Sequence, residues 1–270
     1  MEEAVACVPC VVTPAMNDSL LHEFLASEVE TALKQMAPLK APGSDGMPSI
    51  FYKKYWHVVG PDVIKGVLSC LNLGQLLQAI NHTYITLIPK VKNPERVTKF
   101  RPISLCNVIY KIVSKVLANR PKTILPHIIS ETQNAFVLGR LITDNILVAV
   151  ETLHHMHKTK VGRDGAMALK LDMSKAYDRV EWDYLRCLME KMGFHQRWVS
   201  LMMECISSVS YSLLINGEPR GLVQPSRGLR QGDPLSPYLF LLCAEGLHSM
   251  IRQAEIQGEL KGVSICRRGP

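Results

Sequence analysis

The stretch Gly165-Ala-Met-Ala-Leu-Lys-Leu-Asp-Met-Ser-Lys-Ala-Tyr-Asp-Arg-Val-Glu-Trp182 is the one relative to which the rest of the chain can be placed, and it carries one carboxylate, Asp172, to the end of a predicted strand. Over residues 166–173, small or apolar side chains alternate loosely with Lys170 and Asp172, a pattern typical of a half-buried strand. The acid-rich segment 178–183 then opens a helix. An aspartate at the end of a strand suits Mg²⁺, which prefers oxygen ligands and leaves room for water and phosphates. An ordinary surface aspartate is the alternative interpretation.

The second landmark is Arg227-Gly-Leu-Arg-Gln-Gly-Asp-Pro-Leu-Ser-Pro-Tyr-Leu-Phe240. Residues 170–182 and 228–237 together resemble the first two palm motifs of a reverse transcriptase, and they are most similar to those of plant non-LTR (LINE-type) retroelements. Three upstream blocks resemble the finger motifs of the same family, in the same order: Lys-Ala-Pro-Gly-Ser-Asp-Gly-Met-Pro (40–48), Tyr-Ile-Thr-Leu-Ile-Pro-Lys (84–90) and Phe-Arg-Pro-Ile-Ser-Leu-Cys-Asn (100–107). Five ordered blocks argue strongly against a chance match, whereas a single block would be weak.

The resemblance implies an α+β chain with the right-hand polymerase fold, in which helix-rich fingers join an incomplete ferredoxin-like palm. Residues 1–18 contain two prolines and no periodicity, so we expect a leader or linker remnant there. Residues 19–164 would form the fingers and residues 165–270 a partial palm. In the family, two further carboxylates come from an Ala-Asp-Asp hairpin after the second palm motif, but this sequence contains no Asp-Asp pair. Residues 261–270 resemble the lead-in to that hairpin, so we expect a chain truncated before it, with the thumb absent.

The resemblance also assigns a catalytic metal site. In the family, the carboxylate at the position of Asp172 binds Mg²⁺, and two cations activate the primer hydroxyl and hold the triphosphate. With one carboxylate of that set encoded, we expect the isolated chain to be inactive. Asp178 lies six residues further on, and we expect it to be structural or to give polar support near the triphosphate.

Five residues are expected to contact the nucleotide by the same resemblance. Lys90 and Arg101 would project from a finger hairpin and neutralise the triphosphate, since Arg offers a bidentate fork and Lys a compact charge. Lys92 is an alternative to Lys90. Tyr177 matches the family's aromatic residue under the sugar, which leaves no room for a 2′ hydroxyl; the alternative is a core tyrosine packed beside Trp182. In addition, Gln231 and Gly232 would lie beside the nascent base pair, glycine because it permits close backbone approach.

Composition is consistent with a folded, nucleic-acid-binding protein. The 270 residues are 47% hydrophobic and 20% charged, which excludes a wholly disordered chain. The net charge is +7, and residues 90–122 carry nine Lys and Arg side chains against one acid, Glu95. Such a run indicates a phosphate-rich partner or a solvated face. The partners implied by the resemblance are an RNA template, a DNA primer and deoxynucleoside triphosphates.

Several other kinds of protein are not supported. No apolar run approaches the roughly 20 residues needed to span a membrane. Eight scattered cysteines without an export signal indicate reduced thiols in an intracellular protein, and the resemblance implies a nuclear location. A metal-dependent hydrolase using Asp172 and Asp178 would need a further carboxylate or histidine cluster, and none has convincing spacing. We therefore weigh an RNA-directed DNA polymerase (a nucleotidyltransferase of a transposable element) against an inactive nucleic-acid-binding remnant of the same scaffold.

Patterning predicts the order of the helices and strands. Ser27 and Glu30 form a capping-box pattern at the start of a helix that ends at Ala37-Pro38. Asn216-Gly217 is a strong hairpin signal. The remaining predicted helices start at Pro48 and Pro61 or cover 109–117, 142–156, 182–192, 196–206 and 234–253, and the predicted strands are 83–89, 166–173, 209–215, 220–223 and 261–265.

Overall fold

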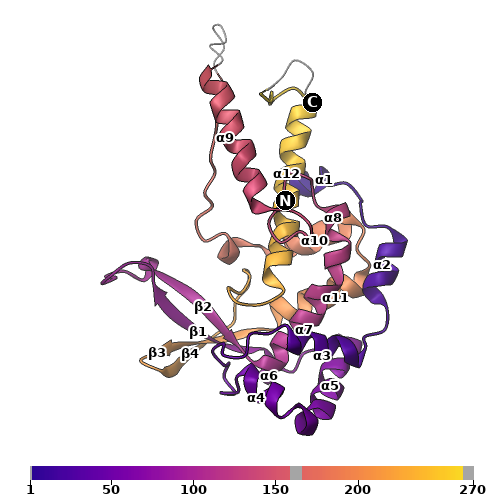
Figure 1. The fold of residues 1–270 in the computed structure, drawn as a ribbon, viewed down its shortest axis with the longest axis vertical. Coiled ribbons are helices and arrows are strands. Elements are labelled where there is room, and N and C mark those ends of the chain that lie inside the picture. The colour runs from indigo at the N-terminus through magenta and orange to yellow at the C-terminus, as the bar shows by residue number, and fades with distance from the viewer. Residues whose placement is uncertain (1, 159–165, 264–270) are drawn as a thin grey trace.

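The computed structural model of the chain describes residues 2–158 and 166–263, and it shows a body of helices with a small sheet extending from one side (Figure 1). The chain is therefore a mixed α+β protein. Its longer helices are α3 (Ala26–Lys34), α5 (Trp56–Leu73), α7 (Val108–Asn119), α9 (Ile142–Lys158), α10 (Trp182–Met192), α11 (Gln196–Ser207) and α12 (Ser236–Ile256). The shorter ones are α1 (Glu2–Ala6), α2 (Pro14–Leu21), α4 (Ser49–Lys54), α6 (Gln78–Asn81) and α8 (Leu125–Ile128), with 3₁₀ turns η1 (Val97–Lys99), η2 (Arg120–Thr123) and η3 (Tyr177–Arg179).

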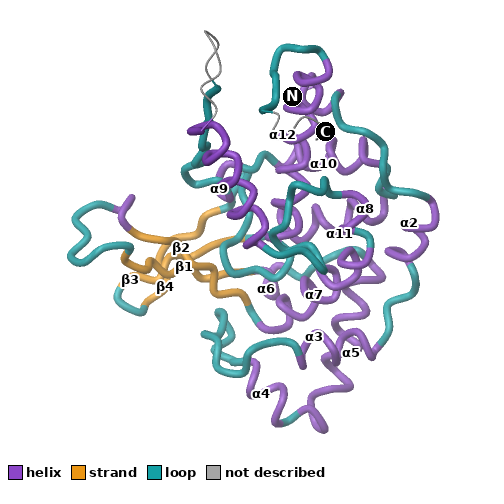
Figure 2. Tube along the Cα trace, turned by 45° about the horizontal axis from the view of Figure 1, so that its top comes forward, coloured by secondary structure: helices purple, strands orange, loops and turns teal. Residues whose placement is uncertain are grey.

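The sheet consists of two hairpins joined side by side (Figure 2). Strands β1 (His82–Pro89) and β2 (Phe100–Cys106) are antiparallel, as are β3 (Ser210–Ile215) and β4 (Glu218–Val223). The order is β2-β1-β3-β4, and β1 runs parallel to β3, so two regions distant in the sequence meet in one sheet. The turn between β3 and β4 confirms the Asn216-Gly217 signal, because both residues have positive φ (54° and 84°).

The core is built from buried side chains of α2, α3, α5, α7, α10, α11 and α12. Tyr110, Leu185, Trp198 and Met202 are among its fully buried side chains. Burying a large apolar side chain contributes roughly 1.5–3 kcal/mol, so this cluster fixes the ends of the sheet and the loop before α12. The predicted helices 109–117, 182–192 and 196–206 and the strand 83–89 are confirmed to within two residues at each end.

Some predicted boundaries are wrong for local reasons. The first long helix begins at Ala26, and its capping bond runs from the Leu25 N–H to Glu28 Oε2 at 2.9 Å rather than between Ser27 and Glu30. Glu28 is held there because its carboxylate also pairs with Arg120 at 2.9 Å. Pro61 does not start a helix but lies inside α5, beyond the first turn, where burial of the helix's apolar face offsets one missing backbone bond. The last helix starts at Ser236, two residues after Pro234.

Residues 2–18 do not form the loose leader that their prolines suggest. They contain α1 and most of α2, and Val8 and Val12 are buried in the core. The N–H groups of Val11 and Val12 both donate to the Met192 carbonyl, at 3.0 and 2.9 Å. This segment therefore packs against the end of α10.

The predicted strand 166–173 is absent. These residues belong to neither a helix nor a strand, and Met167 and Leu169 are exposed. A strand needs a neighbour to satisfy its backbone N–H and C=O groups, and no strand of the described residues lies beside this segment. The neighbouring α9 forms as predicted, yet none of its described residues is buried, so the expected apolar face of Ile142, Ile146 and Val150 is exposed.

The predicted strand 261–265 lies partly outside the described residues, and its described portion, 261–263, is not a strand. Gly165, the first residue of the stretch quoted above, also lies outside them. No helix within residues 2–158 and 166–263 combines the length and apolar character needed to cross a lipid bilayer.

Candidate functional site

The loop between β4 and α12 is anchored by a buried ion pair. Arg230 Nη2 lies 3.1 Å from Asp233 Oδ2, and each residue is 3% exposed. Asp233 Oδ2 also accepts a hydrogen bond of 2.6 Å from the Tyr110 hydroxyl, and Asp233 Oδ1 accepts one of 2.9 Å from the Leu235 N–H. Every charge in this pair therefore has a partner, which is the condition under which buried charges are tolerated.

The same arginine ties the loop to α6 and α11. Arg230 donates to Asn81 Oδ1 at 2.5 Å and to the Cys205 carbonyl at 2.7 Å, and its guanidinium stacks 3.9 Å from the Tyr110 ring centroid. Burial raises the pKa of Tyr110 well above its usual value, so the hydroxyl stays protonated and continues to donate to Asp233. Burial likewise raises the pKa of nearby Tyr211 to about 12.

Sequence reasoning included Arg230 and Asp233 in a motif but gave them no role. The available signal was the pair of opposite charges three residues apart inside a glycine-rich, otherwise apolar block. The sequence alone does not reveal that these two charges are buried and paired with each other.

Gln231 and Gly232 follow the anchor directly. The Gln231 carbonyl accepts a hydrogen bond of 2.9 Å from the Ser104 N–H on β2. Gly232 has φ of +117°, and a Cβ there would lie 3.0 Å from the Ser104 carbonyl oxygen. Glycine is required at this position because the loop passes so close to β2.

The loop also forms hydrogen bonds with residues 177–182, which end the stretch 165–182 quoted at the start of the sequence analysis. The Gly228 N–H donates to the Val180 carbonyl at 2.8 Å, and the Leu229 N–H donates to the Tyr177 carbonyl at 2.9 Å. Trp182 Nε1 donates to the Gly228 carbonyl at 2.8 Å. The two landmarks therefore form one unit, although about fifty residues separate them in the sequence.

The upstream blocks 40–48 and 100–107 are joined at Asn107. Its Oδ1 accepts hydrogen bonds from the Ser44 hydroxyl at 3.1 Å and the Asp45 N–H at 3.2 Å. Gly43 packs so closely here that an added Cβ would overlap Asn107. The turn-rich loop predicted at 41–48 is thus fixed against the end of β2.

Tyr177, Gln231 and Gly232 line one cavity of about 460 Å³. The Tyr177 ring is half-buried and packs against Phe240, with ring centroids 4.9 Å apart. Burial raises the pKa of Tyr177. Three of the five predicted nucleotide-binding residues therefore share a cavity, whose other lining residues are Gln35, Met36, Ala37, Lys40, Lys111, Lys115, Asp233, Pro234 and Pro237.

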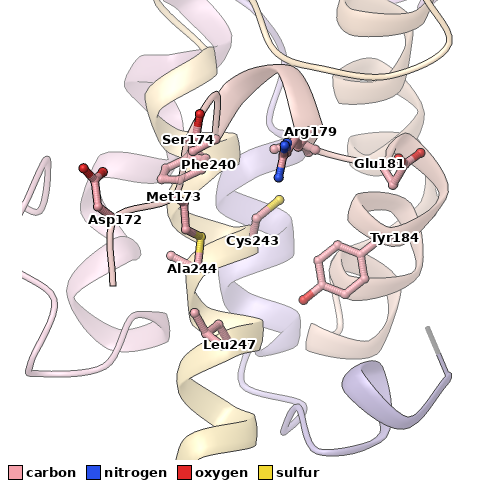
Figure 3. A pocket seen from close by; sticks show the side chains of 12 residues that line it. Asp172, Met173, Ser174, Arg179, Glu181, Tyr184, Phe240, Cys243, Ala244 and Leu247 are labelled. Atoms are coloured by element: carbon pink, nitrogen blue, oxygen red, sulfur yellow. The ribbon is translucent and has the colours of Figure 1, made fainter. Parts of the chain in front are cut away.

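Asp172 lines a second cavity, of about 530 Å³, between its own segment and α12. Figure 3 places its carboxylate at the opposite side of this cavity from Glu181 and Tyr184. Phe240 lines the second cavity and contacts Tyr177 of the first, so this ring pair lies between the two.

The donor set does not fit two magnesium ions. Asp172 is an exposed carboxylate on an unpaired segment, and within residues 2–158 and 166–263 no three His, Cys, Asp or Glu side chains are grouped to hold a metal ion. Hard cations need several oxygen ligands, so Asp172 alone is insufficient. Asp178 lies against Gly228 through its backbone, and its carboxylate does not complete such a group.

Lys90 and Arg101 lie on the β1–β2 hairpin, which projects from the helical body (Figure 1). Lys90 N–H donates to the Lys99 carbonyl at 2.8 Å, and Arg101 pairs with Ile88 in the ladder. Both cations are exposed, and neither is among the described residues that line the cavity of Tyr177. The structure thus places these two predicted residues apart from the other three.

Comparison with known proteins identifies a family match over most of the chain. Residues 88–267 match the family described as "Reverse transcriptase (RNA-dependent DNA polymerase)". The chain is 30% identical over 243 residues to the "Transposon TX1 uncharacterized 149 kDa protein" of Xenopus laevis, covering 90% of this chain and 18% of that protein.

Two further relatives are informative. A "Retrovirus-related Pol polyprotein from type-2 retrotransposable element R2DM" of Drosophila melanogaster is 26% identical over 233 residues, covering 86% of this chain and 21% of that protein. An uncharacterized mitochondrial protein of Arabidopsis thaliana is 60% identical over 57 residues, covering 21% of this chain and 47% of that protein. The chain spans about a fifth of the length of the two long relatives and about half of the shorter one.

Proposed function

This chain belongs to the reverse transcriptase (RNA-dependent DNA polymerase) family, and from that premise we propose that it supplies the fingers and part of the palm of an RNA-directed DNA polymerase from a plant non-LTR (LINE-type) retroelement. The observation that carries the proposal is the joining of the two landmarks by backbone bonds around the cavity lined by Tyr177, Gln231 and Gly232. The proposed partners are an RNA template, a DNA primer and deoxynucleoside triphosphates, and the proposed location is the nucleus.

In this proposal the residues of the chain bind the incoming nucleotide and orient it. The Tyr177 ring, held by Phe240, forms a flat apolar surface beneath the sugar, and the Gln231 side chain lies beside the base pair. Lys90 and Arg101, both exposed on the β1–β2 hairpin, would neutralise the triphosphate. The family's two magnesium ions would supply electrostatic stabilisation, but Asp172 alone does not fit them.

A second candidate is a nucleic-acid-binding remnant without catalysis. It is favoured by the absence, among residues 2–158 and 166–263, of any three His, Cys, Asp or Glu side chains grouped to hold a metal ion. The two candidates differ in whether the chain supports synthesis once the family's remaining carboxylates are provided.

A chimera tests the proposed function. In it, the Ala-Asp-Asp hairpin and following region of a related reverse transcriptase are joined after Gly262. We expect extension of a DNA primer on an RNA template, because the chain then provides the nucleotide cavity and the graft the missing carboxylates. A folded, RNA-binding chimera that extends no primer would favour the non-catalytic remnant.

Tyr177→Ala in the same chimera should admit ribonucleotides. Removing the ring opens space beneath the sugar, where a 2′ hydroxyl would otherwise clash. We expect kcat/KM for deoxyribonucleotides, divided by kcat/KM for ribonucleotides, to fall by about tenfold or more. A tenfold change corresponds to a loss of ~1.4 kcal/mol of discrimination between the two substrates. Tyr55→Ala removes an exposed tyrosine ring that lines neither cavity and serves as the control. An unchanged ratio in Tyr177→Ala would assign Tyr177 to the core.

A further inference from the structure

The cavity lined by Tyr177 and Gln231 has a second wall made of lysines. Lys111 and Lys115 come from α7, four residues and thus about one helical turn apart, and Lys40 comes from the loop between α3 and α4. The one acid among the lining residues that the structure describes is Asp233, whose carboxylate is already paired with Arg230. This wall, which we call the lysine wall, therefore carries an excess of positive charge.

The lysine wall is held in place without acidic partners. Lys111 is 7% exposed, and its Nζ donates to the Ala41 carbonyl at 3.3 Å. Among the described residues, none of the three lysines forms an ion pair. Burial lowers the pKa of Lys111 and of Lys115, and the charge of Lys40 lowers both further, while Asp45 and Asp233 act on Lys111 in the opposite sense. Gathering cations here costs free energy that an anionic ligand would recover.

The surroundings indicate what kind of anion fits. Pro234 and Pro237 of the cavity lie at the start of the 21-residue helix α12, whose N-terminal end carries partial positive charge. The cations also continue beyond the cavity, because the Lys115 side chain interacts with Lys122 in η2. A row of cations along α7 matches a ligand whose negative charge repeats along a chain rather than one compact ion.

We propose that the lysine wall of Lys40, Lys111 and Lys115 binds phosphate groups of a single-stranded nucleic acid whose bases pass Tyr177 and Gln231. The inference rests on the proposed function and adds to it a strand-binding site made of residues other than the exposed hairpin residues Lys90 and Arg101. A nucleoside triphosphate carries the same chemical group, so the experiment has an arm for each source.

The test compares three forms of the 270-residue chain by fluorescence anisotropy with a labelled single-stranded RNA oligonucleotide across a range of salt concentrations. The variant Lys111→Gln/Lys115→Gln removes two charges and keeps an amide that can donate to Ala41. The matched control Lys65→Gln/Lys191→Gln removes two exposed charges from α5 and α10. We expect the slope of log affinity against log salt to decrease by about 0.7 per lysine, hence ~1.4, in the first variant and to stay unchanged in the control.

Two additions keep the test decisive. Since Lys111 is buried, Lys40→Gln/Lys115→Gln repeats the measurement with the two more exposed lysines, and the same slope decrease is expected. The second arm measures the affinity for dATP in place of RNA. Any change in dATP affinity should be the same in the lysine-wall variants as in the control. If RNA binding keeps its slope in both lysine-wall variants, or if dATP affinity alone falls, the inference is overturned while the proposed function stands. If the unaltered chain shows no salt-dependent RNA binding, the proposed function fails and the inference with it.

Discussion

Replacing Asp172 with asparagine abolishes primer extension by the chimera, while leaving its RNA affinity and melting temperature unchanged. Asp172 is exposed and makes no ion pair among the described residues, so the fold does not depend on its charge. Asparagine keeps the size of the side chain but removes the negative charge that a divalent cation requires. We therefore expect extension to fall below detection in a gel-based assay.

The matched control is Asp62→Asn in the same chimera, because Asp62 is an exposed aspartate on α5, outside both cavities. It should extend primers like the unaltered chimera. Extension by Asp172→Asn at the parent's rate would remove Asp172 from the catalytic assignment and leave an ordinary surface aspartate.

Arg230→Met should lower the free energy of unfolding by about 3–5 kcal/mol, the range found when one partner of a buried ion pair is removed. The substitution leaves the Asp233 carboxylate 3% exposed with hydrogen bonds from Tyr110 and Leu235 but without its counter-charge. It also breaks the links to Asn81 and Cys205 that hold the loop against α6 and α11. Urea denaturation followed by circular dichroism measures the effect.

The chain contains a matched surface pair. Arg227 Nη1 and Glu181 Oε1 are 2.9 Å apart, compared with 3.1 Å for Arg230 and Asp233, but both side chains are 57% exposed. Arg227→Met should therefore cost at most about 1 kcal/mol. The double variant Arg230→Met/Asp233→Leu should be more stable than Arg230→Met alone, since both charges are then gone. Equal urea midpoints for Arg230→Met and Arg227→Met would contradict the anchoring role.

Local signals in the sequence were sufficient for much of the fold. The Asn216-Gly217 turn, the helix 182–192 and the strand 83–89 depend on nearby residues, and they are confirmed. The strand 166–173 depends instead on a pairing partner, and alternation alone does not provide one. Similarly, the apolar pattern of α9 predicted a helix correctly but predicted its burial wrongly, because burial is a property of the surroundings.

For the candidate site too, some residues could be identified from the sequence and others could not. Tyr177, Gln231 and Gly232 were identified from their motifs, and the structure gathers them in one cavity. Their roles toward a nucleotide remain predictions, as do those of Asp172, Lys90 and Arg101. The lysine wall was not identified, because Lys40 lies some seventy residues before Lys111 and only the packing of α7 against the preceding loop brings them together.

The parallel pairing of β1 with β3 also constrains how the chain forms during translation. His82 faces Ser210, 128 residues later, with the His82 Nδ1 and Ser210 Oγ atoms 2.8 Å apart. At about 5–20 residues per second, a ribosome needs roughly 6 to 26 seconds to add the intervening chain. During that interval the inner edge of the β1–β2 hairpin has no partner, and an open edge can pair with strands of other chains. Slower elongation should therefore increase co-translational aggregation, and chaperones that cover strand edges should suppress it.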